Sequence, residues 1–215
     1  MLTKDFLPNT YFKIVQDDEM FRINTDTEVL GGFLEVYKKD LVYDFGCGNG
    51  ALMLYASLFN PAKIVGIDIN KKALDLAKIN LDNNGITNYE LINEDLKVLK
   101  IKEADVIICN PPYMKTEEAN LCLNEHKKIA KHEYLIILEE LVKSINRNLK
   151  DGGTLYFLFQ TKRIEEVFLT FAKYNLQIKE LQFVYPRGKE YSLVFMVKAR
   201  KNAKSATNVL KPITI

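Results

Sequence analysis

A short apolar run that leads into a cluster of glycines constrains the fold more than any other part of the chain. Residues 41–45 (Leu-Val-Tyr-Asp-Phe) have the composition of a buried strand, and Gly46, Gly48 and Gly50 precede the helix-like segment 51–56. Glycines in such a turn allow positive φ and let the backbone approach a ligand closely. A strand, a glycine-rich turn and a helix in this order are typical of a nucleotide-binding loop.

A second strand-like segment places an acid where nucleotide-binding folds use one. Residues 63–67 form another apolar run, which ends at Asp68 and is followed by Ile69. An acid at about this distance beyond the glycine turn accepts hydrogen bonds from ribose hydroxyls in nucleotide-binding folds. The joint spacing favours a ligand site over an ordinary tight turn with a surface carboxylate.

The rest of the chain alternates strand-like and helix-like segments. Strands are expected at 41–45, 63–67, 89–92, 105–109, 154–159, 177–184 and 191–198, and helices at 26–37, 50–59, 71–83, 132–149 and 162–174. This alternation predicts an α/β fold with a mainly parallel, seven-stranded sheet and helices on both faces. The last two strands are expected to be antiparallel. We expect a single domain made of an N-terminal cap segment, a core and a basic C-terminal tail (1–40, 41–200 and 201–215).

Two prolines mark the end of the strand expected at 105–109. Asn110-Pro111-Pro112-Tyr113 follows this run, and prolines cannot extend a central strand because they lack the N–H that the ladder needs. Asn110 and Tyr113 therefore lie at the carboxyl end of a strand, where ligands bind in open α/β sheets. An amide and an aromatic ring beside a rigid turn suit a flat, amino-bearing group such as adenine. An isolated Asn-Pro-Pro would favour an ordinary strand-to-loop turn.

The glycine turn is ambiguous about its cofactor. Gly46, Gly48 and Ala51 also satisfy the dinucleotide pattern G-x-G-x-x-G/A, so NAD must be weighed. Two features argue against NAD. Asp44 and Gly50 extend the motif to Asp-x-Gly-x-Gly-x-Gly, and Asn-Pro-Pro-Tyr follows the fourth strand rather than lying in a separate substrate domain.

Together these motifs resemble those of class I S-adenosylmethionine-dependent methyltransferases, in the amino-methylating branch that carries Asn-Pro-Pro-Tyr. Flanking stretches narrow the resemblance to the bacterial tRNA-Val (adenine-N6) methyltransferases, namely 12–16, 21–30, 130–133, 184–186, 193–199 and 210–212. The resemblance covers nearly the whole chain. It implies a Rossmann-like fold with an antiparallel last strand, S-adenosylmethionine as cofactor, and methylation of the N6 amino group of adenine 37 in the anticodon loop of tRNA-Val.

The resemblance also implies roles for individual residues. The Asn110 side-chain oxygen and the Pro111 carbonyl would accept the two hydrogens of the target amine, and Tyr113 would stack on the base. The expected catalytic set is Asn110, Pro111, Pro112 and Tyr113. The set expected to contact the cofactor is Asp44, Gly46, Cys47, Gly48, Gly50, Asp68, Ile69, Asp95, Leu96, Asn110 and Thr25, in which Asp68 takes the ribose and Asp95 the cofactor adenine.

Several of these positions have a second interpretation. Asp44 is expected either to steady the glycine turn or to contact the methionine ammonium through water. Asp95 also suits the N-cap of a helix beginning at Leu96, and Thr25 lies in a stretch that suits the cap of the first helix. His132 is expected to be structural or to contact RNA rather than to act as a base, because amine methylation needs no imidazole.

Positive charge gathers at the C-terminal end. Residues 185–215 contain seven Lys or Arg and one Glu, a net charge of +6 on a chain whose total is +2, so the remainder carries −4. A basic end on an acidic body fits a phosphate-backbone footprint, and a solvated lysine tail is the alternative. The expected RNA contacts are Arg187, Lys189, Arg200, Lys201 and Lys204.

Composition argues against several other classes. The chain has no run of about 18 apolar residues and no apolar signal segment near Met1. Its three scattered cysteines give neither a disulfide framework nor a zinc-ligand spacing. We therefore expect a cytoplasmic protein with no metal and no membrane contact, and favour a monomer that binds tRNA.

Three other functions are open to a chain with these motifs. Glutamine-N5 methylation of release factors also uses Asn-Pro-Pro-Tyr, but that family carries a helical domain ahead of the glycine motif, and only about forty residues precede Asp44 here. Methylation of DNA adenine usually needs a sizeable target-recognition region, for which this chain has no room. A catalytically silent RNA-binding module would keep the fold, but the complete set of motifs argues against it.

Overall fold

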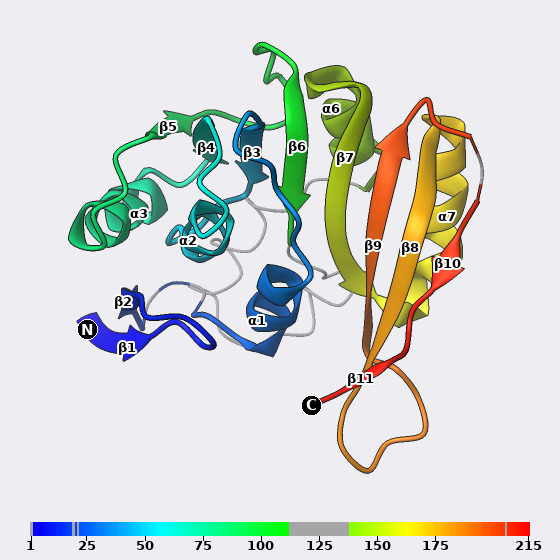
Figure 1. Ribbon diagram of the computed structural model, residues 1–215, viewed down its shortest axis with the longest axis horizontal. Helices are drawn as coiled ribbons and strands as arrows, with labels where there is room; N and C mark the ends of the chain where they lie inside the picture. The colour runs from blue at the N-terminus through cyan, green and yellow to red at the C-terminus, as the bar shows by residue number, and fades with distance from the viewer. Residues whose placement is uncertain (1, 19, 21, 112–137, 205) are drawn as a thin grey trace, which may run out of the picture.

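The structure is a computed structural model that describes residues 2–18, 20, 22–111, 138–204 and 206–215. One large sheet runs through it (Figure 1). Its strands are β3 (Leu41–Phe45), β4 (Lys63–Asp68), β5 (Tyr89–Asn93), β6 (Ala104–Cys109), β7 (Leu149–Gln160), β8 (Leu176–Tyr185), β9 (Val194–Lys201), β10 (Asn208–Val209) and β11 (Ile213–Thr214). They follow the spatial order β10-β8-β9-β7-β6-β3-β4-β5, and β11 also pairs with β8.

The strand directions confirm the predicted Rossmann-like α/β fold. Every pairing in this sheet is parallel except those of β9, which runs antiparallel to both β7 and β8. The seven predicted strands correspond to β3 through β9. The sheet is wider than predicted, because β10 and β11 pair with the outer edge of β8. Residues 208–209 and 213–214 thus extend the sheet instead of trailing from it.

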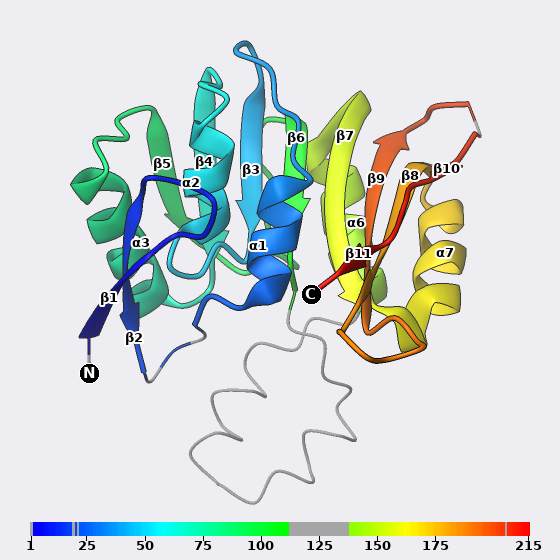
Figure 2. The same cartoon turned by 60° about the horizontal axis from the view of Figure 1, so that its bottom comes forward.

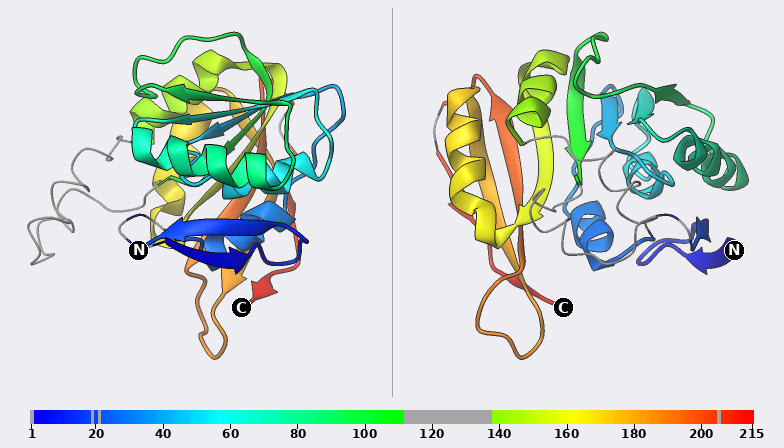
Figure 3. Two further views of the ribbon diagram at one scale, coloured as in Figure 1. Left: turned by 90° about the vertical axis from the view of Figure 1, so that its left-hand side faces the viewer. Right: turned by 180° about the vertical axis from the view of Figure 1, so that it is seen from behind.

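Helices cover both faces of the sheet, as predicted. The described helices are α1 (Thr25–Gly32), α2 (Ala51–Ser57), α3 (Lys71–Asn83), α6 (Leu138–Asn148), α7 (Ile164–Lys173) and the 3-10 turn η1 (Thr161–Arg163). Alternate strand residues point to opposite faces, so Val42 packs in the core under α1, α2 and α3, and Tyr43 packs under α6 and α7. Figure 3 shows α6 and α7 in front of the sheet when it is seen from behind. None of the described helices is long and apolar enough to cross a bilayer.

Two predicted helix ends are wrong. The first helix was expected to reach residue 37, but α1 ends at Gly32. The Tyr156 hydroxyl bonds the Glu35 N–H at 3.1 Å and the Glu35 carbonyl at 2.8 Å, so these groups do not continue the helical hydrogen-bond pattern. The helix expected at 132–149 is described only from Leu138, and Leu149 already pairs with Ala104 in the sheet. Strand β7 therefore begins five residues before the predicted 154, with a register irregularity in its pairing.

An N-terminal hairpin was not predicted. Strands β1 (Leu2–Phe6) and β2 (Lys13–Asp17) pair antiparallel and form a separate two-stranded sheet. The inner strand β2 lies against α3, and Ile14 and Phe12 are buried in the core shared with α1 and α2. In Figure 1 the hairpin lies below α2 and α3, on the same side of the large sheet as α1.

Candidate functional site

Three predicted site residues lie side by side at the carboxyl edge of the sheet. The last residue of β3 lies opposite Ile67 of β4 and opposite the last residue of β6. The residues that come next on the three strands are Gly46, Asp68 and Asn110, and neighbouring strands lie about 4.8 Å apart. The glycine turn and the Asn110 amide therefore lie at the same edge of the sheet. Figure 2 brings this edge forward, with α1 beside it.

The glycine turn presents its backbone to open space. Gly46, Gly48 and Gly50 have φ values of +75°, +53° and +82°, which side-chain-bearing residues rarely adopt. The turn is fixed to β4, because the N–H groups of Gly46 and Cys47 donate to the Ile67 carbonyl at 2.8 and 3.1 Å. A Cβ placed on Gly48 would meet no heavy atom of the described residues within 4 Å. The turn therefore leaves room for a ligand to contact its main chain.

Asp68 both braces the turn and retains room for a ligand. Its carboxylate accepts the Gly48 N–H at 2.9 Å and the Asn70 N–H at 2.8 Å. Burial raises the pKa of Asp68 above the ordinary carboxyl value, against the lowering effect of these backbone donors. Because a carboxylate has about four acceptor positions, Asp68 can still accept hydrogen bonds from two ribose hydroxyls.

Asp44 is a buried carboxyl group without a partner in the described part of the chain. Its side chain is 0% exposed, and neither oxygen has a hydrogen bond. Burial, with the nearby charge of Asp68, raises the pKa of Asp44 to about 8. No hydrogen bond among the described residues joins Asp44 to the glycine turn, and its contact with the methionine ammonium through water stays a prediction.

These features together test whether S-adenosylmethionine fits the site. The cofactor has an ammonium group, a ribose and a flat adenine. The glycine turn offers open main chain, Asp68 offers acceptors, and Asp44 is a buried carboxyl group that a nearby cation would ionise. The residues at the sheet edge therefore fit this cofactor.

The residues expected around the cofactor adenine lie after β4 and β5. Asp95 Oδ1 accepts the Lys97 N–H at 2.9 Å, so this side chain caps a turn at 96–98, where the capping interpretation expected a helix. Leu96 packs partly against the core. Ile69 is 45% exposed, which leaves its side chain accessible to a flat ring. Contact of these residues with a cofactor stays a prediction.

The described part of the catalytic motif lies at the end of β6. Asn110 is partly buried, and Pro111 is buried. The preceding residue, Cys109, is fully buried, and burial raises the pKa of its thiol. Pro112, Tyr113 and His132 lie outside the described residues, so the roles assigned to them stay predictions.

The start of α1 is capped by Asn24, whose Oδ1 accepts the Thr27 N–H at 3.1 Å. The stretch therefore caps the helix, as one interpretation predicted. Thr25 lines a cavity of about 500 Å³ together with Phe33 and Ile215. The predicted contact of Thr25 with the cofactor stays a prediction.

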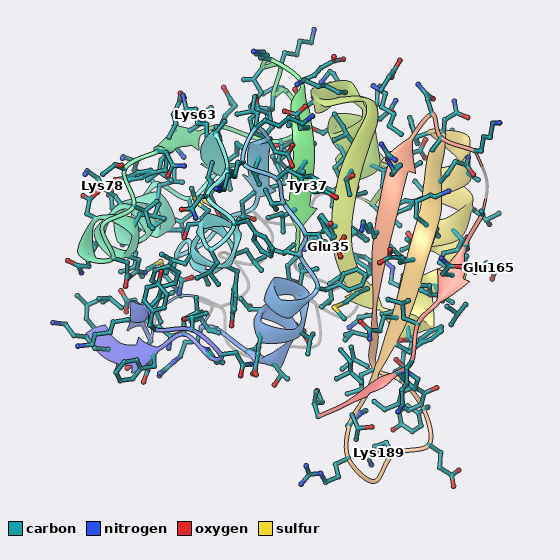
Figure 4. All side chains as sticks on the ribbon, viewed as in Figure 1. Glu35, Tyr37, Lys63, Lys78, Glu165 and Lys189 are labelled. Atoms are coloured by element: carbon teal, nitrogen blue, oxygen red, sulfur yellow. The ribbon has the colours of Figure 1, made fainter. Side chains whose placement is uncertain are left out.

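The basic residues expected to contact RNA lie at two ends of the sheet. Arg187 and Lys189 are exposed in the turn 186–193, beyond the end of β8. Figure 4 shows Lys189 at the tip of this turn. Arg200 and Lys201 lie at the far end of β9, and Lys204 follows them beyond that end. Figure 1 shows that these two ends are opposite edges of the molecule.

Two of these residues have structural partners. Lys201 Nζ donates to the carbonyls of Asn146 and Leu149, both at 2.8 Å, and its side chain is only 12% exposed. The Arg200 guanidinium donates twice to the Gly152 carbonyl, at 3.0 and 2.8 Å. These contacts satisfy carbonyls at the end of α6 and the start of β7. We therefore correct the prediction for Lys201, which has a structural role.

Two buried amides near the site were not singled out from the sequence. Asn80 is 0% exposed, and its amide bonds the N–H and carbonyl of Val15 at 2.7 and 3.0 Å and the carbonyl of Asn49, in the glycine turn, at 2.9 Å. Gln16 accepts the N–H of Ile23 at 2.7 Å, just before α1. Strand β2 thus braces both the turn and the entry to α1. The signal was an asparagine on the apolar face of the helix predicted at 71–83.

Comparison with known proteins adds the family. A family model described as a methyltransferase domain matches residues 37–189. Two curated relatives are each named tRNA1(Val) (adenine(37)-N6)-methyltransferase. The one from Cytophaga hutchinsonii is 27% identical over 180 residues, covering 81% of this chain and 74% of its own. The one from Dyadobacter fermentans is 31% identical over 153 residues, covering 69% and 62%.

Solved structures share the fold at low sequence identity. A predicted O-methyltransferase from Agrobacterium tumefaciens has a TM-score of 0.69 at 16% identity, covering 88% of this chain and 86% of its own. A tRNA m1G37 methyltransferase from Methanocaldococcus jannaschii has a TM-score of 0.68 at 18% identity, covering 94% of this chain and 57% of its own. The sheet order, the glycine turn and the family match lead to one conclusion: the chain belongs to the methyltransferase-domain family.

Proposed function

We propose that the protein transfers a methyl group from S-adenosylmethionine to the N6 amine of adenine 37 in the anticodon loop of tRNA-Val. The observation that carries this proposal is the placement of the glycine turn, Asp68 and Asn110 at one edge of three adjacent strands. The two curated relatives, which are named for this reaction, support the choice of substrate.

The cofactor side of the reaction is a matter of binding and orientation. S-adenosylmethionine supplies an electrophilic methyl group on a sulfonium. Asp68 would accept the ribose hydroxyls, and Asp44 would balance the ammonium charge in a site where it has no other partner among the described residues. No carboxylate in this arrangement acts as an acid or base.

The substrate side of the reaction depends on Asn110 and Pro111. The exocyclic amine of adenine is a weak nucleophile because its lone pair is delocalised into the ring. Two acceptors, the Asn110 side-chain oxygen and the Pro111 carbonyl, would hold both hydrogens and favour a pyramidal nitrogen. Such positioning can lower a barrier by several kcal/mol. The methylated ammonium then loses its proton readily, so no strong base is needed.

The target adenine must leave its stack to enter the site. Tyr113 would stack on it, a contact worth about 1–3 kcal/mol. Arg187 and Lys189 lie at the same end of the sheet as Asn110 and would contact phosphates, which makes binding salt-dependent. Arg200 and Lys204, at the opposite end, would contact a more distant part of the tRNA. We further propose that the chain acts in the cytoplasm as a single-domain monomer.

Substitution of Asn110 tests the proposal. Asn110→Ala should abolish methyl transfer to a tRNA-Val transcript, while the dissociation constant for S-adenosylmethionine, measured by calorimetry, changes by only a few fold. Asn83→Ala, on the exposed side of α3, is the matched control. Normal turnover in Asn110→Ala would remove the assigned role. Methylation of a release factor in preference to tRNA would overturn the proposed substrate.

A further inference from the structure

A second pocket lies next to the proposed catalytic edge. Its volume is about 330 Å³, and its lining includes Asp26, Gln160, Lys162, Tyr191, Leu193 and Ile215. This volume falls within the range of about 300–1,000 Å³ that is typical of small-molecule sites. The walls come from the first turn of α1, from η1 and from the turn 186–193. Figure 2 shows the end of the chain, which lines the pocket, between α1 and that turn.

The sheet register places this pocket one strand away from Asn110. Cys109 lies opposite Phe157 on the neighbouring strand β7. Asn110 is one residue beyond Cys109, whereas Gln160 is three residues beyond Phe157. One strand spacing and two residue steps separate Asn110 from Gln160, which gives about 8 Å between their main chains. A strand of RNA that places one nucleotide at Asn110 can therefore place its neighbour in this pocket.

One wall of the pocket is an aromatic platform on a fixed base. Tyr191 is 57% exposed and Leu193 is 49% exposed, and they alternate with the buried Ser192 and Val194. The hydroxyl of Ser192 lies within hydrogen-bond distance of the carbonyls of Val184 and Val194, at 3.0 and 2.7 Å, which share its single proton. Ser192 thus anchors this part of the turn, and Tyr191 and Leu193 on either side of it both line the pocket.

The pocket also holds polar groups with unused hydrogen-bonding capacity. In the parts of the chain that the structure describes, the Gln160 amide and the Lys162 ammonium make no side-chain hydrogen bond or ion pair. Asp26 is the acidic residue in the lining, and the adjoining turn adds Arg187 and Lys189. The combination of an aromatic ring, an amide and a cation matches the three parts of a nucleotide: its base, the edge of that base and its phosphate.

We propose that this pocket binds the nucleotide next to the methylated adenine. The neighbouring base stacks on Tyr191, the Gln160 amide bonds the edge of that base, and Lys162 pairs with its phosphate. The inference rests on the proposed tRNA methylation and extends it, because it gives the enzyme a contact that holds the anticodon loop open beside Asn110. Stacking on an aromatic side chain is tolerant of base identity, so the pocket contributes affinity and register more than sequence selection.

The test uses the full chain and an anticodon stem-loop RNA of tRNA-Val. Tyr191→Ala should raise KM for the RNA at least about fivefold, and Tyr191→Phe should retain near-normal KM because it keeps the ring. Lys162→Gln should raise KM and lower the salt dependence of RNA binding by about one unit of slope. The matched controls are Tyr37→Ala and Lys39→Gln, two exposed residues before β3. Figure 4 shows Tyr37 far from the turn 186–193.

RNAs with an abasic site at nucleotide 36 or 38 separate stacking from a general structural effect. If the pocket holds one of these bases, its removal raises KM for the wild type but adds little in Tyr191→Ala, because both changes remove the same contact. An unchanged KM in Tyr191→Ala, or full additivity with both abasic RNAs, overturns the pocket while leaving the methylation intact. A wild-type protein that methylates no tRNA overturns the proposed function itself, and the pocket assignment with it.

Discussion

The buried amide of Asn80 gives the sharpest test of how the N-terminal hairpin supports the site. Asn80 of α3 bonds Val15 of β2, and Asn84, which caps the C-terminal end of α3, bonds Lys13 of β2. Each bonds both the N–H and the carbonyl of its strand residue. Four residues of helix rise about 6 Å, and two residues of strand rise about 6.8 Å. The two asparagines therefore match the spacing of the strand and pair with it as a second strand would.

The cost of removing the Asn80 amide can be worked out from its contacts. Asn80→Ala leaves three backbone groups without partners: the Val15 N–H, the Val15 carbonyl and the Asn49 carbonyl. A buried polar group left unpaired costs about 1–3 kcal/mol. Allowing for partial access of water to Asn49, we expect a loss of about 3–5 kcal/mol in the free energy of unfolding. For a chain of this size that corresponds to a fall in Tm of about 6–20 °C.

Asn84→Ala is the matched control, because Asn84 makes the same pair of bonds to an exposed strand residue. Water replaces those bonds, so we expect a loss of about 1 kcal/mol or less. Thermal unfolding with circular dichroism measures both variants, and calorimetry measures their affinity for S-adenosylmethionine. Asn80→Ala should also weaken cofactor binding, since its third bond holds Asn49 in the glycine turn. Equal stability losses in the two variants would refute the reasoning that burial sets the cost.

Two other predictions concern charge. The pKa of Asp44 is raised from 3.8 to about 8 in the ligand-free fold, so the free energy of unfolding should fall as pH rises through this range. Asp44→Asn should flatten this pH dependence, which urea titrations at several pH values measure. Because a bound cation favours ionised Asp44, cofactor binding at pH 7 should release up to one proton more in the wild type than in Asp44→Asn. Calorimetry in buffers of different ionisation enthalpy measures the number of protons released. Equal proton release by the two proteins would contradict the prediction. Lys201→Ala should lower the free energy of unfolding by about 1–3 kcal/mol without changing the salt slope of RNA binding. Lys189→Ala should lower that salt slope without changing the free energy of unfolding. A changed slope in Lys201→Ala alone would restore the predicted RNA contact of Lys201.

The sequence predicted the elements whose signals are local. Strands β3, β4 and β6 are short apolar runs that end at glycines, an acid or prolines, so both their type and their carboxyl ends could be located. The helix end at Gly32 could not be found in this way, because the Glu35 groups that would continue the helix bond Tyr156, 121 residues later along the chain. The start of β7 was missed for a related reason: Leu149 fits an apolar helix face as well as it fits a strand opposite Ala104.

The candidate site shows the same division between local and distant causes. Its glycine turn, Asp68 and Asn110 come from motifs with strong local spacing, and the sheet order places them together. The basic residues were grouped because they are close in sequence. Strand β9 carries the chain from one edge of the sheet to the other, so it separates Arg187 and Lys189 from Arg200 and Lys204. Lys201 was counted as part of the basic C-terminal end. Its ammonium group donates to carbonyls at the end of α6 and the start of β7, and a count of charges does not reveal such partners.

The unpartnered Asp44 suggests how this fold couples ligand binding to stability. A buried carboxyl whose pKa is about 8 disfavours its own ionised form, so the ligand-free protein carries a cost at neutral pH that a bound cation removes. If the cofactor ammonium lies beside Asp44, as we propose, its binding removes this cost, and cofactor binding also raises stability by mass action. The Asn80 contacts oppose this cost from the other side of the turn, by tying Asn49 to α3 and β2. A turn held firmly by neutral amides can keep an unpaired carboxyl buried at its base, and in that way the N-terminal hairpin, far from Asn110 in sequence, supports the candidate site.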